Sequence, residues 1–159
     1  MEPTIDKYSD NNKGDFEKIW VNWLSNSMGI QPQQVDIDEV RNPVDNYIKT
    51  GGMAFYANKD NECIGVVAVK KLNETDYEFC KLVVSEKARG LGLGKQLVQK
   101  CIDYVKEVKG QNLYLQSFHK LEIAVKMYKK MGFIDTPAPT GMLVVTRTEI
   151  IMKMEFIHQ

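Results

Sequence analysis

The residues best suited to hold a ligand lie in one glycine-rich turn between a strand-like and a helical segment. Three of the eleven glycines of the 159-residue chain fall within five positions, at Gly90, Gly92 and Gly94. Glycine tolerates positive φ and close approach to a ligand, and a helix start leaves N–H donors unpaired beside a partial positive charge. Such a turn suits an anion, and phosphate is the usual ligand at a helix N-terminus of this kind.

Two familiar phosphate-binding loops do not fit this turn. The loop of nucleotide hydrolases requires Ser or Thr after its Gly-Lys, because a hydroxyl must hold magnesium, whereas Gln96 follows Lys95. The dinucleotide-binding pattern Gly-x-Gly-x-x-Gly, started at Gly90 or Gly92, would place its third glycine on Lys95 or Leu97. The remaining alternative is a surface turn that only begins a helix, but each glycine weakens a helix start by about 1 kcal/mol without a compensating role.

The pattern Arg89-x-x-Gly92-x-Gly94 resembles the pyrophosphate-binding loop of the GCN5-related N-acetyltransferase (GNAT) family. The run 78–84 before it resembles that family's fourth strand, which carries the thioester and pantetheine of acyl-CoA along its edge. The resemblance implies that backbone N–H groups of the turn bind the pyrophosphate of acetyl-CoA, with Arg89 and Lys95 adding positive charge. The positions that it assigns to acetyl-CoA are Leu82, Val83, Val84, Arg89, Gly90, Leu91, Gly92, Leu93, Gly94 and Lys95.

A later segment completes the resemblance. The run 124–133 resembles the family's helix that ends in Gly-Phe, with Tyr128 five residues before Phe133. The match is close over roughly residues 62 to 135. It departs from the family at Leu121, where many relatives carry an asparagine that contacts the pantetheine arm. Leucine cannot make that contact.

Two side chains are candidates for the proton transfers that acyl transfer to an amine requires. The amine must lose a proton and the leaving thiolate must gain one. Glu78 stands where many family members carry a strand glutamate, which implies a general base acting through water; the alternative is a solvated or cross-strand-paired glutamate. Tyr128 is the implied proton donor, and its alternative is a core tyrosine. Main-chain N–H at Val83 or Val84 would polarise the carbonyl.

Other residues with reactive or aromatic side chains receive weaker assignments. His119 is expected to be solvated or to cap a helix rather than act as a base. Trp20 and Trp23 belong to the first helix and are expected to pack in the protein core. The alternative is that one or both form a wall of the acceptor site. The three cysteines show no metal-binding spacing, so free buried thiols and no metal are predicted.

Composition predicts one soluble domain, residues 1–159. Lys plus Arg equals Asp plus Glu at 21 each, so no basic field is present to attract nucleic acid or an anionic membrane. The start has no apolar signal core and no run approaches the length of a membrane span, which favours the cytoplasm.

Hydrophobic periodicity predicts a mixed α/β fold in the order βααβββαβαββ. The helix between the fourth and fifth strands forms a crossover, so these strands should be parallel. The resemblance adds that they splay within a mostly antiparallel sheet flanked by helices. Broken alternation near Leu82 predicts a β-bulge or a strand buried on both faces. Helices are expected near 13–28, 38–49, 92–108 and 121–131, and strands near 53–57, 63–70, 77–84, 113–118, 142–145 and 149–156.

The sequence therefore predicts an N-acyltransferase that moves an acetyl group from acetyl-CoA to a primary amine of a small molecule or peptide, by direct attack in a ternary complex. One alternative is a non-catalytic CoA-binding sensor or partner module, and another is a nucleotide-phosphate binder of a different family. Neutral net charge favours small amines, amino acids, antibiotics or peptide termini over histone tails. Similar proteins often pair, so a homodimer stays open.

Overall fold

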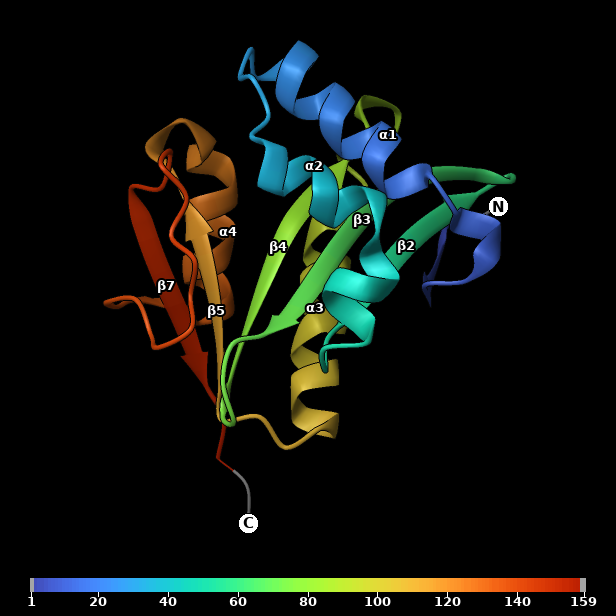
Figure 1. Ribbon diagram of the computed structural model, residues 1–159. Coiled ribbons are helices and arrows are strands. Elements are labelled where there is room, and N and C mark those ends of the chain that lie inside the picture. The colour runs from blue at the N-terminus through green and yellow to red at the C-terminus, as the bar shows by residue number, and fades with distance from the viewer. Residues whose placement is uncertain (1, 158–159) are drawn as a thin grey trace.

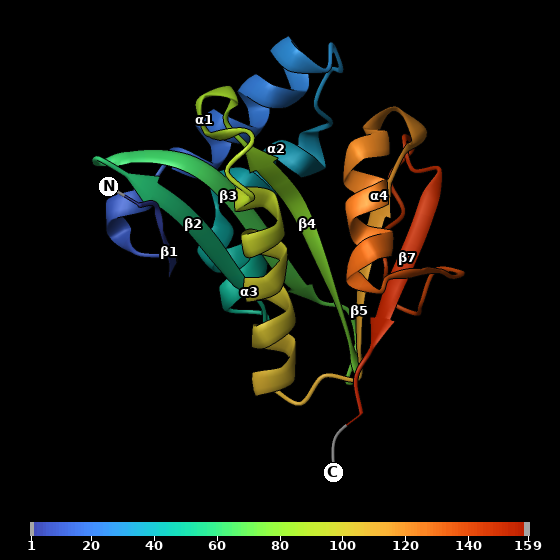
Figure 2. The same cartoon turned by 180° about the vertical axis from the view of Figure 1, so that it is seen from behind.

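The computed structural model describes residues 2–157 and contains a seven-stranded sheet with helices on both faces (Figure 1). The strands are β1 (Thr4–Lys7), β2 (Met53–Lys59), β3 (Glu62–Lys71), β4 (Asp76–Val84), β5 (Asn112–Ser117), β6 (Ile134–Asp135) and β7 (Ile150–Glu155). The α-helices are α1 (Asp15–Asn22), α2 (Gln34–Arg41), α3 (Leu93–Glu107) and α4 (Glu122–Met131). The strand order is β1-β2-β3-β4-β5-β7-β6. Figure 2 shows α3 and α4 on one face of the sheet, with α1 and α2 on the other.

The predicted order of elements is confirmed, with corrections to several boundaries. α2 begins at Gln34, earlier than predicted. A separate helical turn (Val44–Ile48) follows Pro43, because proline has no N–H with which to continue α2. The prediction of a strand at 142–145 is wrong. The sixth strand, β6, is Ile134–Asp135, and it begins two residues after Gly132, which caps the end of α4 at a φ of 110°. Residues 136–149 instead run as an irregular segment beside β5.

Apolar stripes of the helices fill a core on each face of the sheet. On the face of α3 and α4, Leu97, Cys101 and Val105 are fully buried against the strands. On the opposite face, Phe16 and Trp20 of α1 pack with the core residues of β2 and β3. The two cores hold the strands rigidly wherever the sheet is continuous. No helix within residues 2–157 has the length and apolarity needed to cross a membrane.

The parallel pair β4 and β5 is confirmed, and the two strands separate toward their C-terminal ends. Their pairing is limited to Asp76 with Asn112, Tyr77 with Leu113 and Glu78 with Tyr114. Beyond Glu78 the strands diverge in a V (Figure 1). Because backbone groups of a strand alternate between its two neighbours, part of β4 beyond Glu78 has no strand partner on the β5 side.

A β-bulge interrupts β4, which confirms that alternative near Leu82. Val66 pairs with Val83 and Ala68 with Cys80, so Lys81 and Leu82 together lie opposite one residue of β3. Lys81 has a φ of 59°, in the left-handed region. Its side chain is only 6% exposed. The bulge thereby places a cation inside the protein at the opening of the V.

Candidate active site

The glycine-rich turn lies where β4 ends and α3 begins. Gly90 has a φ of 83°, and Gly92, the N-cap of α3, a φ of 72°. A Cβ built on either would meet no atom within 4 Å, and one built on Gly94 would meet only Val84 Cγ2 at 3.9 Å. The first N–H groups of a helix lack intrahelical partners, and within the described residues no side chain caps the start of α3. The turn thus presents hydrogen-bond donors toward open space at the positive end of a 15-residue helix.

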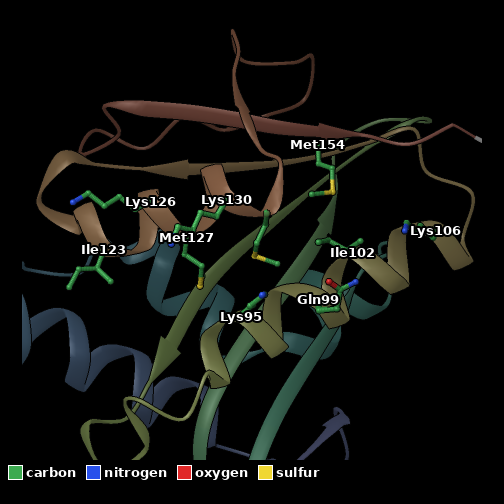
Figure 3. A pocket seen from close by; sticks show the side chains of 10 residues that line it. Lys95, Gln99, Ile102, Lys106, Ile123, Lys126, Met127, Lys130 and Met154 are labelled. Carbon is green, nitrogen blue, oxygen red and sulfur yellow. The ribbon is translucent and has the colours of Figure 1, made fainter.

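A groove of about 720 Å³ lies between α3 and α4 (Figure 3). Its border carries lysines from both helices, and Lys95 also belongs to the glycine-rich turn. Facing lysines create a positive potential that attracts an anionic ligand. Sequence analysis singled out only Lys95 among these lysines. Lys126 and Lys130 could have been found from their spacing, because residues four apart lie one turn apart on the same face of α4. The lining residues are Lys95, Gln99, Ile102, Lys106, Ile123, Lys126, Met127, Lys130, Met131 and Met154.

A second cavity of about 110 Å³ is lined by both residues predicted to transfer protons, Glu78 and Tyr128. β4, β5, α4 and the irregular segment 136–149 contribute to its walls. Trp20 and Trp23 also line it, although Trp20 is at the same time a core residue at 2% exposure. His119 is not among the lining residues, and its backbone N–H donates to Glu149 instead.

Glu78 is buried within the second cavity. It lies opposite Lys70 of β3, and its side chain accepts a hydrogen bond at Oε2 from Gln116 Nε2 at 2.9 Å. The residue is 3% exposed, so the alternative of a solvated glutamate is wrong. Burial raises the pKa of Glu78, while the charge of Lys70 and the hydrogen bond from Gln116 act in the opposite direction. A raised pKa makes this carboxylate a stronger base than an exposed one.

Gln116 of β5 is the residue that sequence analysis missed. Besides its bond to Glu78, its Nε2 donates to the carbonyl of Leu143 at 2.9 Å. Its Oε1 accepts from the N–H of Val145 at 3.2 Å and from Thr148 Oγ1 at 2.6 Å. These four bonds fix the orientation of the amide toward Glu78. They also occupy residues 143–145, which explains why that apolar run does not form a strand.

Tyr128 combines a packed ring with a hydroxyl that is available to a ligand. The ring contacts Phe79 and Phe133 edge-on, at centroid distances of 5.5 and 6.1 Å. Within the described part of the chain, no protein group forms a hydrogen bond with its hydroxyl. Burial raises the pKa of Tyr128 further above that of a free phenol. The hydroxyl therefore stays protonated and can donate.

A buried ion cluster lies beside Glu78 and joins three separate parts of the chain. Asp36 of α2, whose side chain is 1% exposed, lies 3.0 Å from Lys81 Nζ and 3.1 Å from Arg147 Nη1. Both cations also lie over the ring of Trp20, at 5.0 and 5.8 Å. Burial alone would favour the neutral carboxyl, but Lys81 and Arg147 hold the pKa of Asp36 below its ordinary value. The cluster fixes α2, the bulge and the segment 136–149 together.

Cysteine and carboxylate groups do not assemble into a metal centre in the region that the structure describes. No group of three or more His, Cys, Asp or Glu residues there could hold a metal ion. Cys63, Cys80 and Cys101 are free, and Cys101 is fully buried.

Comparisons with known proteins agree with this geometry. The model of the acetyltransferase (GNAT) family matches residues 18–133. An uncharacterised N-acetyltransferase of Schizosaccharomyces pombe is 31% identical over 125 residues, which cover 77% of this chain and 76% of that protein. A GNAT-family acetyltransferase from Staphylococcus aureus superposes with a TM-score of 0.89 at 22% identity, covering 97% of this chain and 99% of that one. A putative acetyltransferase from Salmonella typhimurium, solved with acetyl-CoA, has a TM-score of 0.79 at 14% identity, covering 100% and 96%.

Proposed function

The chain belongs to the GNAT acetyltransferase family, and from this premise we propose that it transfers an acetyl group from acetyl-CoA to a primary amine of a small molecule or peptide. The amine attacks directly in a ternary complex. The observation that carries the proposal is that Glu78 of β4 and Tyr128 of α4 line one cavity, and that β4 leads from this cavity to the glycine-rich turn. We further propose that the chain works as a single domain in the cytoplasm, where its free cysteines would stay reduced.

The residues of the turn and groove fit acetyl-CoA. N–H groups from Gly90 to Lys95 would bind the diphosphate, and the lysines of the groove would neutralise the remaining phosphate charge. At about 3.3 Å per strand residue, Glu78 lies about 20 Å from the end of β4, which leaves room for the pantetheine arm. Backbone groups at Leu82, Val83 and Val84 would bind that arm. Ser117 Oγ, buried in the second cavity and without a hydrogen-bond partner among residues 2–157, offers a further hydrogen bond.

Three groups of the chain would carry the chemistry. Glu78, held through Oε2, would take the proton of the amine, directly or through water. Sequence analysis assigned the polarisation of the acetyl carbonyl to N–H at Val83 or Val84, but these lie about 17 to 20 Å along β4 from Glu78, so a backbone N–H nearer to Glu78 would have to polarise it. Tyr128 would hydrogen-bond to the leaving sulfur. Since a thiol is a stronger acid than a phenol by about 1.5 pK units, and burial of Tyr128 widens that gap, donation must accompany bond cleavage rather than precede it.

The proposal is tested by following release of free thiol from acetyl-CoA with a panel of amines. Glu78→Gln should lower kcat by about 100-fold and Tyr128→Phe by about tenfold, because each removes one proton transfer. Affinity for acetyl-CoA should change less than about twofold, since neither residue belongs to the turn or the groove. Glu74→Gln, at an exposed position, is the matched control. Tight acetyl-CoA binding without amine-dependent thiol release would instead identify a CoA-binding module.

A further inference from the structure

The charged side chains around the second cavity balance. Three cations and three anions line it: Lys70, Lys81, Arg147, Asp36, Glu39 and Glu78. With Glu78 ionised, as its role as the base requires, the lining is neutral. An ammonium that enters this small space adds one positive charge. A buried charge without a counter-ion is costly, so the cavity favours an amine that also brings a negative charge.

Arg147 has hydrogen-bond donors that the ion cluster does not use. Glu39 Oε2 lies 2.8 Å from Lys70 Nζ and 4.0 Å from Lys81 Nζ, and Asp36 Oδ1 lies 3.0 Å from Lys81 Nζ. Arg147 contacts Asp36 Oδ2 at 3.1 Å. Arg147 uses only Nη1 for that contact, and no other hydrogen bond of its guanidinium occurs within residues 2–157. A guanidinium has five N–H donors arranged to bind a carboxylate.

This spare guanidinium and the candidate base Glu78 line the same cavity, and Gln116 connects the segments that carry them. Thr148, the neighbour of Arg147 in sequence, donates to Gln116 Oε1, and Gln116 Nε2 donates to Glu78. The cavity between them measures about 110 Å³ and has Trp20 and Trp23 in its wall. An acceptor that spans from Glu78 to Arg147 must therefore be short.

We propose, resting on the acetyl transfer proposed above, that the acceptor is a free amino acid or a comparably short amino carboxylate. Its amine faces Glu78, and its carboxylate binds Arg147 and Lys81. An amine without a carboxylate enters as a cation and leaves the otherwise neutral lining with one excess positive charge. A peptide N-terminus is disfavoured for the same reason, because an amide replaces the carboxylate beside its amine.

The test compares matched acceptors that differ only at the carboxylate. The rate of thiol release from acetyl-CoA is measured with leucine, leucinamide and 3-methylbutylamine, and with the corresponding alanine set, each normalised to its unprotonated amine. We expect kcat/KM to be at least about tenfold higher for the better amino acid than for its amide and its amine. Preference for an amide or an amine overturns the acceptor class while acetyl transfer stands.

Arg147 variants separate this role from a structural one. Arg147→Met should reduce the preference for the amino acid over its amide and its amine to about twofold, mainly by raising the KM of the amino acid. Arg147→Lys, which keeps the charge, should restore part of the preference and covers the case in which the methionine variant does not fold. Arg41→Met, which removes an exposed ion pair with Glu17, is the control. An unchanged preference in both Arg147 variants overturns the inference while acetyl transfer stands; no turnover of any acceptor by wild-type protein that binds acetyl-CoA overturns the proposed function itself.

Discussion

At the scale of single residues, burial makes Glu78 reactive and at the same time costs stability. Its pKa is higher in the folded state than in the unfolded chain, so the native protein binds that proton more tightly. The free energy of unfolding therefore falls as pH rises from the unfolded pKa through the folded one. Glu78→Gln removes this penalty, so an inactive Glu78→Gln variant is expected to be folded at neutral pH.

Gln116 offers a test of how the base is held. In Gln116→Leu, the ionised form of Glu78 loses a hydrogen bond, so its pKa should rise further and the acid limb of the kcat/KM profile should move to higher pH. We expect kcat at neutral pH to fall about tenfold, with little change in KM for acetyl-CoA. Gln34→Leu, which removes an exposed bond to Asp38, is the control. A pH profile that superposes on that of the wild type would show that Gln116 does not position the base.

Residues differ in how readily the sequence reveals them. Glu78 and Tyr128 could be named because each stands in a contiguous segment that resembles a family. Gln116 and Arg147 could not, because their partners come from segments far away in the chain, as in the bond from Thr148 to Gln116 across 32 positions. Only folding of the segment 136–149 beside β5 brings these groups to the cavity.

At the scale of elements, the junction of β4, the glycine-rich turn and α3 is the decisive feature. Glycine density predicted the turn, and broken alternation in β4 indicated the bulge as one of two alternatives, because both leave a local signature. The irregular segment 136–149 left none: its apolar residues 142–145 have the composition of a strand. A strand there was the wrong prediction because the Gln116 side chain engages the backbone groups that a sheet would need.

The N-cap of α3 can be tested against an equivalent N-cap elsewhere. Gly92 and Gly14 both cap helices at positive φ, 72° and 86°, with open space around a built Cβ. Replacement by alanine should therefore cost each about 1 kcal/mol of stability, measured by urea unfolding. Gly92→Ala alone should weaken acetyl-CoA binding, because only this cap lies in the candidate diphosphate site. Equal effects of the two variants on binding would remove the turn from the site.

At the scale of the whole molecule, the sheet opens into a V between two strands, and a buried ion cluster lies beside it. β4 and β5 pair only as far as Glu78, and Asp36 connects α2 to the bulge and to the segment 136–149. The parallel pair and the order of elements were predictable from the crossover rule and periodicity. The ion cluster was not, because Asp36 and Arg147 are 111 positions apart.

Asp36 should therefore stabilise the fold in a pH-dependent way. Asp36→Asn leaves Lys81 buried without its nearest counter-ion and should lower the free energy of unfolding by about 3 kcal/mol at neutral pH. The pKa of Asp36 is depressed in the folded state, so this contribution is present above the unfolded pKa of about 3.8 and disappears as pH falls through the folded value. Asp38→Asn, exposed on the same helix, should change stability by less than about 0.5 kcal/mol. Similar losses for both variants in urea unfolding would contradict this.

The central claim is that one surface, from the glycine-rich turn through the groove to the second cavity, accommodates acetyl-CoA. Isothermal titration calorimetry of the wild-type protein with acetyl-CoA tests it most directly. We expect one molecule per chain, a Kd between about 1 µM and 1 mM, and weaker binding as salt screens the lysines. Absence of measurable affinity for acetyl-CoA and for free CoA at millimolar concentration would contradict the account.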